Sequence, residues 1–143
     1  MAHSTTGLIG AEQHVIKPRV AAFVVDYLLS LALALAVSFL LMSAGVMPSR
    51  GGFVISTITL IFAYYVLCEG QWGRTPGKRA FGLVVVTTDG LSIGYRASVV
   101  RNVFRVVDGV GNYLLGLLVM LLTDRRQRVG DLAADTVVVR ARR

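Results

Sequence analysis

The sequence predicts an all-α membrane protein: an antiparallel transmembrane helix hairpin, a third hydrophobic helical segment and a small cytoplasmic β element. Of 143 residues, 55% are hydrophobic and only 16% are charged, unlike a soluble globular domain. The hydrophobic residues form long runs rather than alternating with polar ones. This length allows one domain. We expect a flexible cytoplasmic tail over residues 1–16, a membrane domain over residues 17–140 and a basic end at residues 141–143.

The first span is predicted within residues 17–46, because residues 27–46 carry no charge. A helix of that length crosses the ~30 Å hydrocarbon core at about 1.5 Å per residue. Asp26 then lies a short way inside the membrane, where a carboxylate is costly. Steps of four residues along the same helix reach only small side chains: Ala22, Ser30, Ala34 and Ser38. Such a seam lets another helix approach closely, so we expect protein to cover this face.

The second span is predicted over residues 53–68, after a tight turn at residues 47–52. Because the turn is short, the second span returns antiparallel to the first. Tyr64, Tyr65 and Trp72 near its end are typical of a membrane interface. Lys and Arg flank both ends of this hairpin more than its turn, which predicts a multi-pass protein of the plasma membrane with a cytoplasmic N-terminus. We expect the first run to be an anchor, since it is too long for a cleaved signal peptide.

The third hydrophobic segment leaves two topologies open. Arg101, Arg105 and Asp108 fall on one helical face, and the apolar run at residues 113–123 is too short to cross alone. Either residues 102–123 cross as one helix, or two short helices bend at residues 109–112, dip into the membrane and return. We favour the re-entrant form, which needs protein cover that the first helix's seam could supply. The positive-inside rule opposes exporting the arginines that follow: Arg125, Arg126, Arg128, Arg140, Arg142 and Arg143.

Two β-branched runs predict a small sheet on the cytoplasmic face. Residues 83–88 precede Asp89-Gly90, a strong hairpin signal, and residues 136–139 have the same character. We expect the two runs to pair. Before them lies a basic turn expected to contact anionic headgroups, with Arg74, Lys78 and Arg79. A phosphate-binding loop is excluded, because Arg79 stands where that motif needs Ser or Thr.

Asp26 is predicted to form an ion pair inside the membrane. Arg19 lies about 10 Å away along the helix axis and is expected to snorkel to the headgroups as an interface anchor. We therefore predict that Asp26 pairs with the third segment, with Arg105 as first partner and Arg101 as second. Together with Asp108, these residues would also line an ion path in a transporter.

These segments together resemble the RDD family, small bacterial and archaeal membrane proteins named for one Arg and two Asp. The resemblance covers most of residues 17–140 and includes TPGKRAFGLVVVTTDG at residues 75–90 and RVGDLAADTVVV at residues 128–139. It implies that the motif residues here are Arg19, Asp26 and Asp131. Many relatives have His before the second Asp, where this chain has Gly130, so a His–Asp role does not carry over. We expect Asp131 to cap or brace a cytoplasmic turn.

Two functions remain open. We favour a structural or accessory membrane module with a fixed Asp–Arg pair. The alternative is a small transporter or ion-coupling protein for cation or proton exchange; it would act as an oligomer, because the spans enclose little volume. We expect no enzyme activity, cofactor or metal, since no nucleophile–base constellation or metal-ligand spacing is visible. Expected partners are anionic lipid headgroups and further copies of the chain or a larger membrane complex; basic cytoplasmic loops explain the net charge of +7 without nucleic acid.

Overall fold

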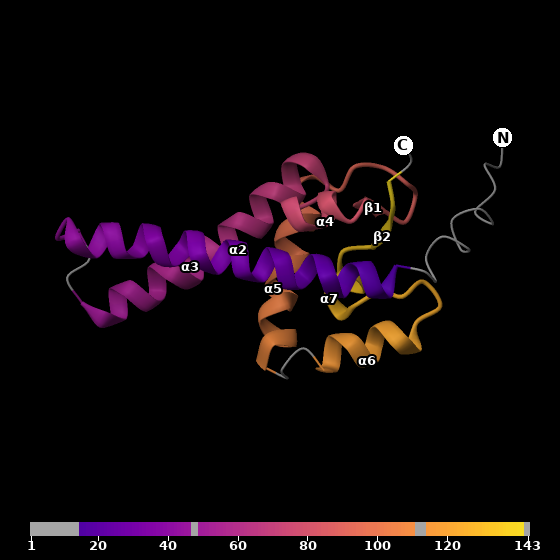
Figure 1. The fold of residues 1–143 in the computed structure, drawn as a ribbon. Coiled ribbons are helices and arrows are strands. Elements are labelled where there is room, and N and C mark those ends of the chain that lie inside the picture. Colours follow the sequence, from indigo (N-terminus) through magenta and orange to yellow (C-terminus); the bar gives the residue numbers. More distant parts are fainter. Residues whose placement is uncertain (1–14, 47–48, 111–113, 142–143) are drawn as a thin grey trace.

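Two long antiparallel helices form the body of the protein (Figure 1). The computed structural model describes residues 15–46, 49–110 and 114–141. Helix α2 covers Ile16–Ser43 and α3 covers Arg50–Trp72. Their most apolar windows have mean hydropathies of 2.3 and 1.9, and both helices are long and apolar enough to cross a membrane. The predicted hairpin is present, although α3 extends beyond the predicted residues 53–68 at both ends.

The ordered fold begins slightly before the predicted membrane domain. Val15 is fully buried and α2 starts at Ile16, so both belong to the fold rather than to a tail. The rest of the predicted tail, residues 1–14, lies outside the described residues, as do residues 47–48 of the predicted turn and residues 142–143 of the predicted basic end.

The buried face of α2 follows the predicted seam. Its buried residues are Arg19, Ala22, Asp26, Ser30, Ala34 and Ser38. Near the hairpin tip, the Ser38 hydroxyl is the acceptor for Ser56 Oγ at 2.7 Å and for Thr57 Oγ1 at 3.0 Å, both on α3. Near the other end, the short helix α4 (Pro76–Ala80) packs on α2. The seam is therefore covered mainly by α3 and α4, whereas in the third segment α5 (Gly94–Val110) packs on α3 and α7 (Val129–Ala133), and α6 (Leu114–Leu122) packs on α5 and α7.

Local sequence signals set the sharp connection from α3 to α4. Gly73 ends α3 with φ +64°, a conformation that few residues other than glycine adopt. Thr75 begins α4, its hydroxyl accepting a 3.4 Å hydrogen bond from the Lys78 N–H, and Pro76 occupies the first turn. This connection turns the chain back toward α2 and brings Lys78 near the end of α3.

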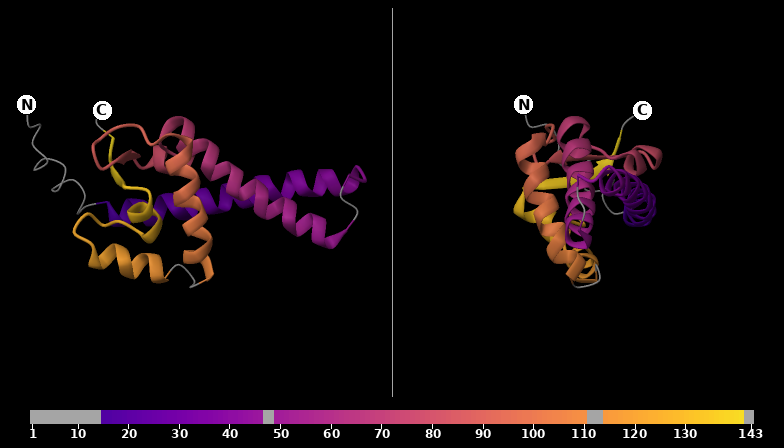
Figure 2. Two further views of the ribbon diagram at one scale, coloured as in Figure 1. Left: turned by 180° about the vertical axis from the view of Figure 1, so that it is seen from behind. Right: turned by 90° about the vertical axis from the view of Figure 1, so that its left-hand side faces the viewer.

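The third segment consists of two helices that run in different directions (Figure 2). Helix α5 (Gly94–Val110) crosses the hairpin, and α6 (Leu114–Leu122) lies below the first half of α2 in the view of Figure 1. Part of the predicted bend, residues 111–113, lies outside the described residues. Over the described ranges, only α2 and α3 qualify as candidate spans. Two separate helices match the bent alternative, and re-entry into the membrane remains a prediction.

A two-stranded antiparallel sheet closes the fold, as predicted. Strand β1 (Leu83–Thr87) pairs with β2 (Thr136–Arg140), with Val85 opposite Val138. An isolated bridge from Val86 to Ser92 forms around the predicted Asp89-Gly90 turn. Short helix α7 (Val129–Ala133) leads into β2. The buried hydrophobic core joins this sheet to the start of α2 and consists of Val15, Ala22, Leu83, Val85, Ile93 and Val138.

The register of the sheet predicts which backbone donor is essential. Val85 donates its N–H to Gly73 O, away from β2, so the alternating ladder places the hydrogen-bonded pairs at Val84–Val139 and Val86–Val137. Val137→Pro removes one of these donors and is expected to free the C-terminal segment for limited proteolysis in detergent. Val137→Ala keeps the N–H and serves as the control. Equal cleavage of the two variants would contradict this register.

Candidate functional site

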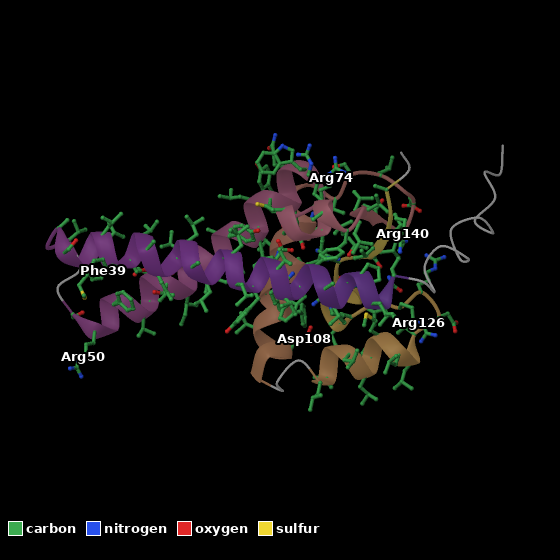
Figure 3. All side chains as sticks on the ribbon, in the orientation of Figure 1. Phe39, Arg50, Arg74, Asp108, Arg126 and Arg140 are labelled. Atoms are coloured by element: carbon green, nitrogen blue, oxygen red, sulfur yellow. The ribbon has the colours of Figure 1, made fainter. Side chains whose placement is uncertain are left out.

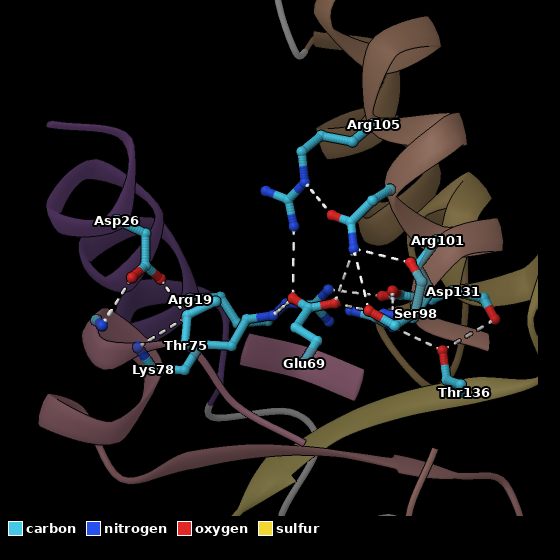
Figure 4. Close-up of polar contacts among 12 residues, drawn as sticks. Arg19, Asp26, Glu69, Thr75, Lys78, Ser98, Arg101, Arg105, Asp131 and Thr136 are labelled. Carbon is cyan, nitrogen blue, oxygen red and sulfur yellow. Dashed lines mark hydrogen bonds and ion pairs between the residues drawn. The ribbon is translucent and has the colours of Figure 1, made fainter. Parts of the chain in front are cut away.

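Six charged side chains from five helices meet at the broad end of the hairpin (Figure 4). We call them the charge cluster: Arg19, Glu69, Lys78, Arg101, Arg105 and Asp131. All are buried except Arg105, whose side chain is 12% exposed. Figure 3 labels Arg74, Arg126 and Arg140 at the same end of the molecule, whereas Arg50 is labelled at the hairpin tip, near Phe39. The cluster therefore joins α2, α3, α4, α5 and α7.

Glu69 is one centre of the cluster and is fully buried in the last turns of α3. Lys78 Nζ donates to its Oε1, Arg101 Nε donates to its Oε2 at 3.1 Å, and Arg105 Nη2 lies 3.5 Å from Oε1. Our sequence analysis did not select Glu69. The sequence feature that could have identified Glu69 is its position as a single acidic residue directly after the apolar run of the predicted second span.

Asp131 is the other centre. Its Oδ2 accepts a 2.6 Å hydrogen bond from Arg19 Nη2 and its Oδ1 accepts one from Arg101 Nη1. Burial raises the pKa of Asp131, but the attraction of Arg101 and Arg19 outweighs it and holds that pKa well below its usual range. The carboxylate also accepts the Arg128 N–H at 3.1 Å, so Asp131 caps α7, whereas the cytoplasmic location of this turn stays a prediction. Arg19 is buried in an ion pair and does not snorkel, which corrects the predicted interface anchor.

Arg101 connects the two centres. Its guanidinium contacts both Glu69 and Asp131, and it also donates to Thr136 Oγ1 at 2.6 Å at the start of β2. Burial lowers the pKa of Arg101, but the attraction of the two carboxylates raises it by a larger amount. The net shift is upward, so the side chain stays charged. One residue of α5 thus fixes α3, α7 and the sheet relative to one another.

Asp26 lies apart from the cluster and is held by three donors. Its Oδ1 accepts the Tyr64 hydroxyl at 2.9 Å and the Gly77 N–H at 2.7 Å, and its Oδ2 accepts the Thr75 hydroxyl. The predicted ion pair with Arg105 or Arg101 is not formed, since both arginines contact Glu69 instead. The physical reason is that α4 packs directly over Asp26, so that Thr75 and Gly77, together with Tyr64 of α3, supply its donors.

The basic turn is divided between the surface and the interior. Arg79 is exposed and Arg74 is partly exposed, but Lys78 is buried against Glu69. Lys78 is therefore not a headgroup contact, contrary to the prediction. Burial lowers the pKa of Lys78 to about 7, because desolvation and the nearby arginines outweigh the attraction of Glu69.

Gly77 allows α4 to approach α2. A Cβ at this position would lie 2.5 Å from Ala22 O and 2.8 Å from Asp26 Oδ1. We expect Gly77→Ala to lower the free energy of unfolding in detergent by about 1–3 kcal/mol, because α4 must move away and its donors leave Asp26. Gly51→Ala, where the added carbon meets open space within 4 Å, is the control. Equal stability of the two variants would contradict the close approach.

A cavity of about 300 Å³ opens beside the charge cluster, between α2, α5 and α6. Its apolar wall includes Val20, Val24 and Leu117, and Arg128 and Asp108 also line it. Asp108, predicted on the face of Arg101 and Arg105, is buried but has no ion pair in the described part of the chain. Within that part no group of three or more His, Cys, Asp and Glu side chains is placed to hold a metal.

Two apolar helices of spanning length, joined at one end by a buried charge cluster, point to a membrane protein. The model of the RDD family matches residues 15–135, and the chain belongs to this family. Comparison with curated proteins and with solved structures gave no match. The three residues that the resemblance singled out occupy two sites: Arg19 and Asp131 form an ion pair in the cluster, whereas Asp26 binds α3 and α4.

Proposed function

We propose that this protein is a non-enzymatic structural or accessory module of the plasma membrane, with the charge cluster as its internal brace. The single observation that carries the proposal is that Arg101 and its two carboxylate partners connect helices far apart in the sequence. A buried polar network of this kind rigidifies a fold when its members are paired.

The environment of Asp26 supports the same function. The Asp26 carboxylate accepts hydrogen bonds from two hydroxyls and one backbone N–H, and these bonds connect α2 with α3 and α4. A carboxylate that carries ions must exchange its partners during each cycle. Three fixed donors favour a residue that holds helices together.

The second candidate is ion-coupled transport, and one observation favours it. Lys78, with a pKa of about 7, lines the cavity that also reaches Asp26. A group that titrates near neutral pH beside a cavity is able to couple proton binding to a change in contacts. In this case further copies of the chain or a larger membrane complex complete the pathway.

Reconstitution in liposomes distinguishes the two candidates. The wild-type protein is expected to move protons and Na⁺ no faster than Asp26→Asn or protein-free liposomes, measured with internal pH-sensitive and Na⁺-sensitive dyes under an imposed gradient. A flux that depends on Asp26 would overturn the structural proposal and establish the transport candidate.

We further propose that both ends of the hairpin are cytoplasmic, an orientation that the distribution of Lys and Arg favours. A cysteine at Ala141, introduced in a Cys68→Ala background, is expected to resist membrane-impermeant thiol reagents in intact cells and to react after the membrane is opened. A cysteine at Ser49, near the hairpin tip, is the control and is expected to react in intact cells. Labelling of position 141 from outside would contradict this orientation.

A further inference from the structure

The cavity between α2, α5 and α6 contains a cation without an acceptor. The Arg128 guanidinium lines the cavity and makes no hydrogen bond or ion pair with the described residues; only its backbone N–H is bonded, to Asp131. Arg128 is partly exposed, and desolvation together with the nearby charge of Arg105 lowers its pKa to about 10, so it remains protonated at neutral pH. A guanidinium in this position favours an anionic oxygen as its partner.

The same cavity contains an acceptor without a donor. Asp108 is 2% exposed, and its Oδ1 has no hydrogen-bond partner in the described part of the chain. Buried polar atoms in native proteins are nearly always bonded to protein, water or a ligand. Asp108 and Arg128 line one cavity but form no ion pair with each other, so one molecule that carries both an anionic oxygen and a hydroxyl can satisfy both.

The outer wall of the cavity is apolar and exposed. Val20 and Val24 on α2 are 48% and 49% exposed, and Leu114 on α6 is 67% exposed. This wall continues into the apolar surfaces of both helices. A cavity of about 300 Å³ is at the lower limit of ligand sites, large enough for a headgroup but not for a whole lipid. An acyl chain attached to that headgroup would lie along the exposed valines and leucines.

The charges favour an anion over a cation. Of the basic residues that line the cavity, Arg19, Lys78 and Arg105 are paired with the carboxylates of the charge cluster, whereas the Arg128 guanidinium has no ion pair among the described residues. Asp26 already accepts three hydrogen bonds. A metal ion would face the like charge of Arg128, and a free phosphate would leave the apolar wall unused.

We propose that this cavity binds one phosphoglycerol lipid. Arg128 holds the phosphate, Asp108 accepts a hydroxyl of the glycerol headgroup, and Val20, Val24 and Leu117 contact the acyl chain. This site goes beyond the proposed structural role and is independent of whether the protein moves ions.

Native mass spectrometry of the intact protein in detergent tests the site directly, with phosphatidylglycerol as the added lipid. Arg128→Gln is expected to raise the Kd at least about tenfold, because it removes charge-assisted hydrogen bonds, and Arg128→Lys is expected to bind at an intermediate level. Arg140→Gln, at an exposed arginine of β2 outside the cavity, is the matched control and is expected to bind like wild type. If Arg128→Gln binds phosphatidylglycerol as tightly as wild type does, the proposed lipid site is wrong and the cavity holds only water.

Ligand comparisons identify the chemistry. Phosphatidylcholine, which lacks both a net negative charge and a headgroup hydroxyl, is expected to bind at least about tenfold more weakly than phosphatidylglycerol. Phosphatidic acid, which has the phosphate but no glycerol headgroup, is expected to bind wild type more weakly than phosphatidylglycerol does. The Asp108→Ala variant is expected to bind the two lipids equally. Glycerol 3-phosphate binding as tightly as the lipid would show that a free phosphate compound is the ligand and overturn the lipid proposal, as would equal binding of phosphatidylcholine.

A second variant keeps the test valid if Arg128→Gln does not fold. Leu117→Trp fills the cavity from its half-exposed wall without removing a charge. It is expected to abolish phosphatidylglycerol binding while its thermal unfolding in detergent stays near that of wild type. A well-folded Leu117→Trp that binds the lipid normally would overturn the proposal.

Discussion

Glu69→Gln is expected to lower the free energy of unfolding in detergent by about 3–5 kcal/mol and to reduce the folded yield sharply. Glutamine keeps the shape of the side chain but removes the carboxylate that compensates Lys78, Arg101 and Arg105. Breaking a buried ion pair by removing one partner leaves an uncompensated charge away from water, and that accounts for the size of the effect. Thermal unfolding and monodisperse yield after purification measure it.

The cause of this loss is testable with two further variants. Glu69→Gln combined with Lys78→Met removes one of the stranded cations and is expected to recover part of the stability, since removing both members of a buried pair is often nearly neutral. Asp89→Asn, at an exposed acid of the turn after β1, is the control and is expected to change stability by less than about 0.5 kcal/mol. A Glu69→Gln protein as stable as that control would contradict the central role of this carboxylate.

Arg101→Met is expected to have an effect of similar size, about 3–5 kcal/mol. The methionine fills much of the volume but leaves Glu69 and Asp131 without their shared partner and removes the hydrogen bond to Thr136. We expect α7 and β2 to loosen first, because Asp131 and Thr136 attach that part of the chain to α5. Hydrogen exchange in detergent would report faster exchange in β2 than in α2.

Two control variants on α5 separate geometry from charge. Arg101→Lys keeps the positive charge, but its single ammonium group cannot donate to both Glu69 and Asp131 as the guanidinium does. It is therefore expected to recover only part of the stability that Arg101→Met loses. Arg96→Met removes an exposed arginine from the same helix and is expected to leave stability near wild type. Full recovery by lysine would show that a single positive charge is sufficient and that the bridging geometry of the guanidinium is not needed.

The sequence alone determined the long-range architecture of the hairpin. The uncharged run after Asp26 and the apolar run of α3 set two helices of spanning length, because the thickness of the hydrocarbon core fixes how many apolar residues a span needs. The four-residue repeat of small side chains identified the buried face of α2, because residues four apart lie on one face of any α-helix. The β-branched runs likewise predicted the pairing of β1 with β2.

Only the tertiary structure decided which charges meet. Arg19 could not be assigned to Asp131 from the sequence, since the two are more than a hundred residues apart and meet only when α7 packs on α5 beside α2. The predicted ion pair between Asp26 and an arginine does not form, because α4 packs over the seam and supplies a hydroxyl and a backbone N–H instead. Helix α4 has only five residues and no clear periodic signal in the sequence. Apolar periodicity is a property of one helix at a time, whereas ion pairing depends on the relative positions of several helices, and no local pattern encodes those positions.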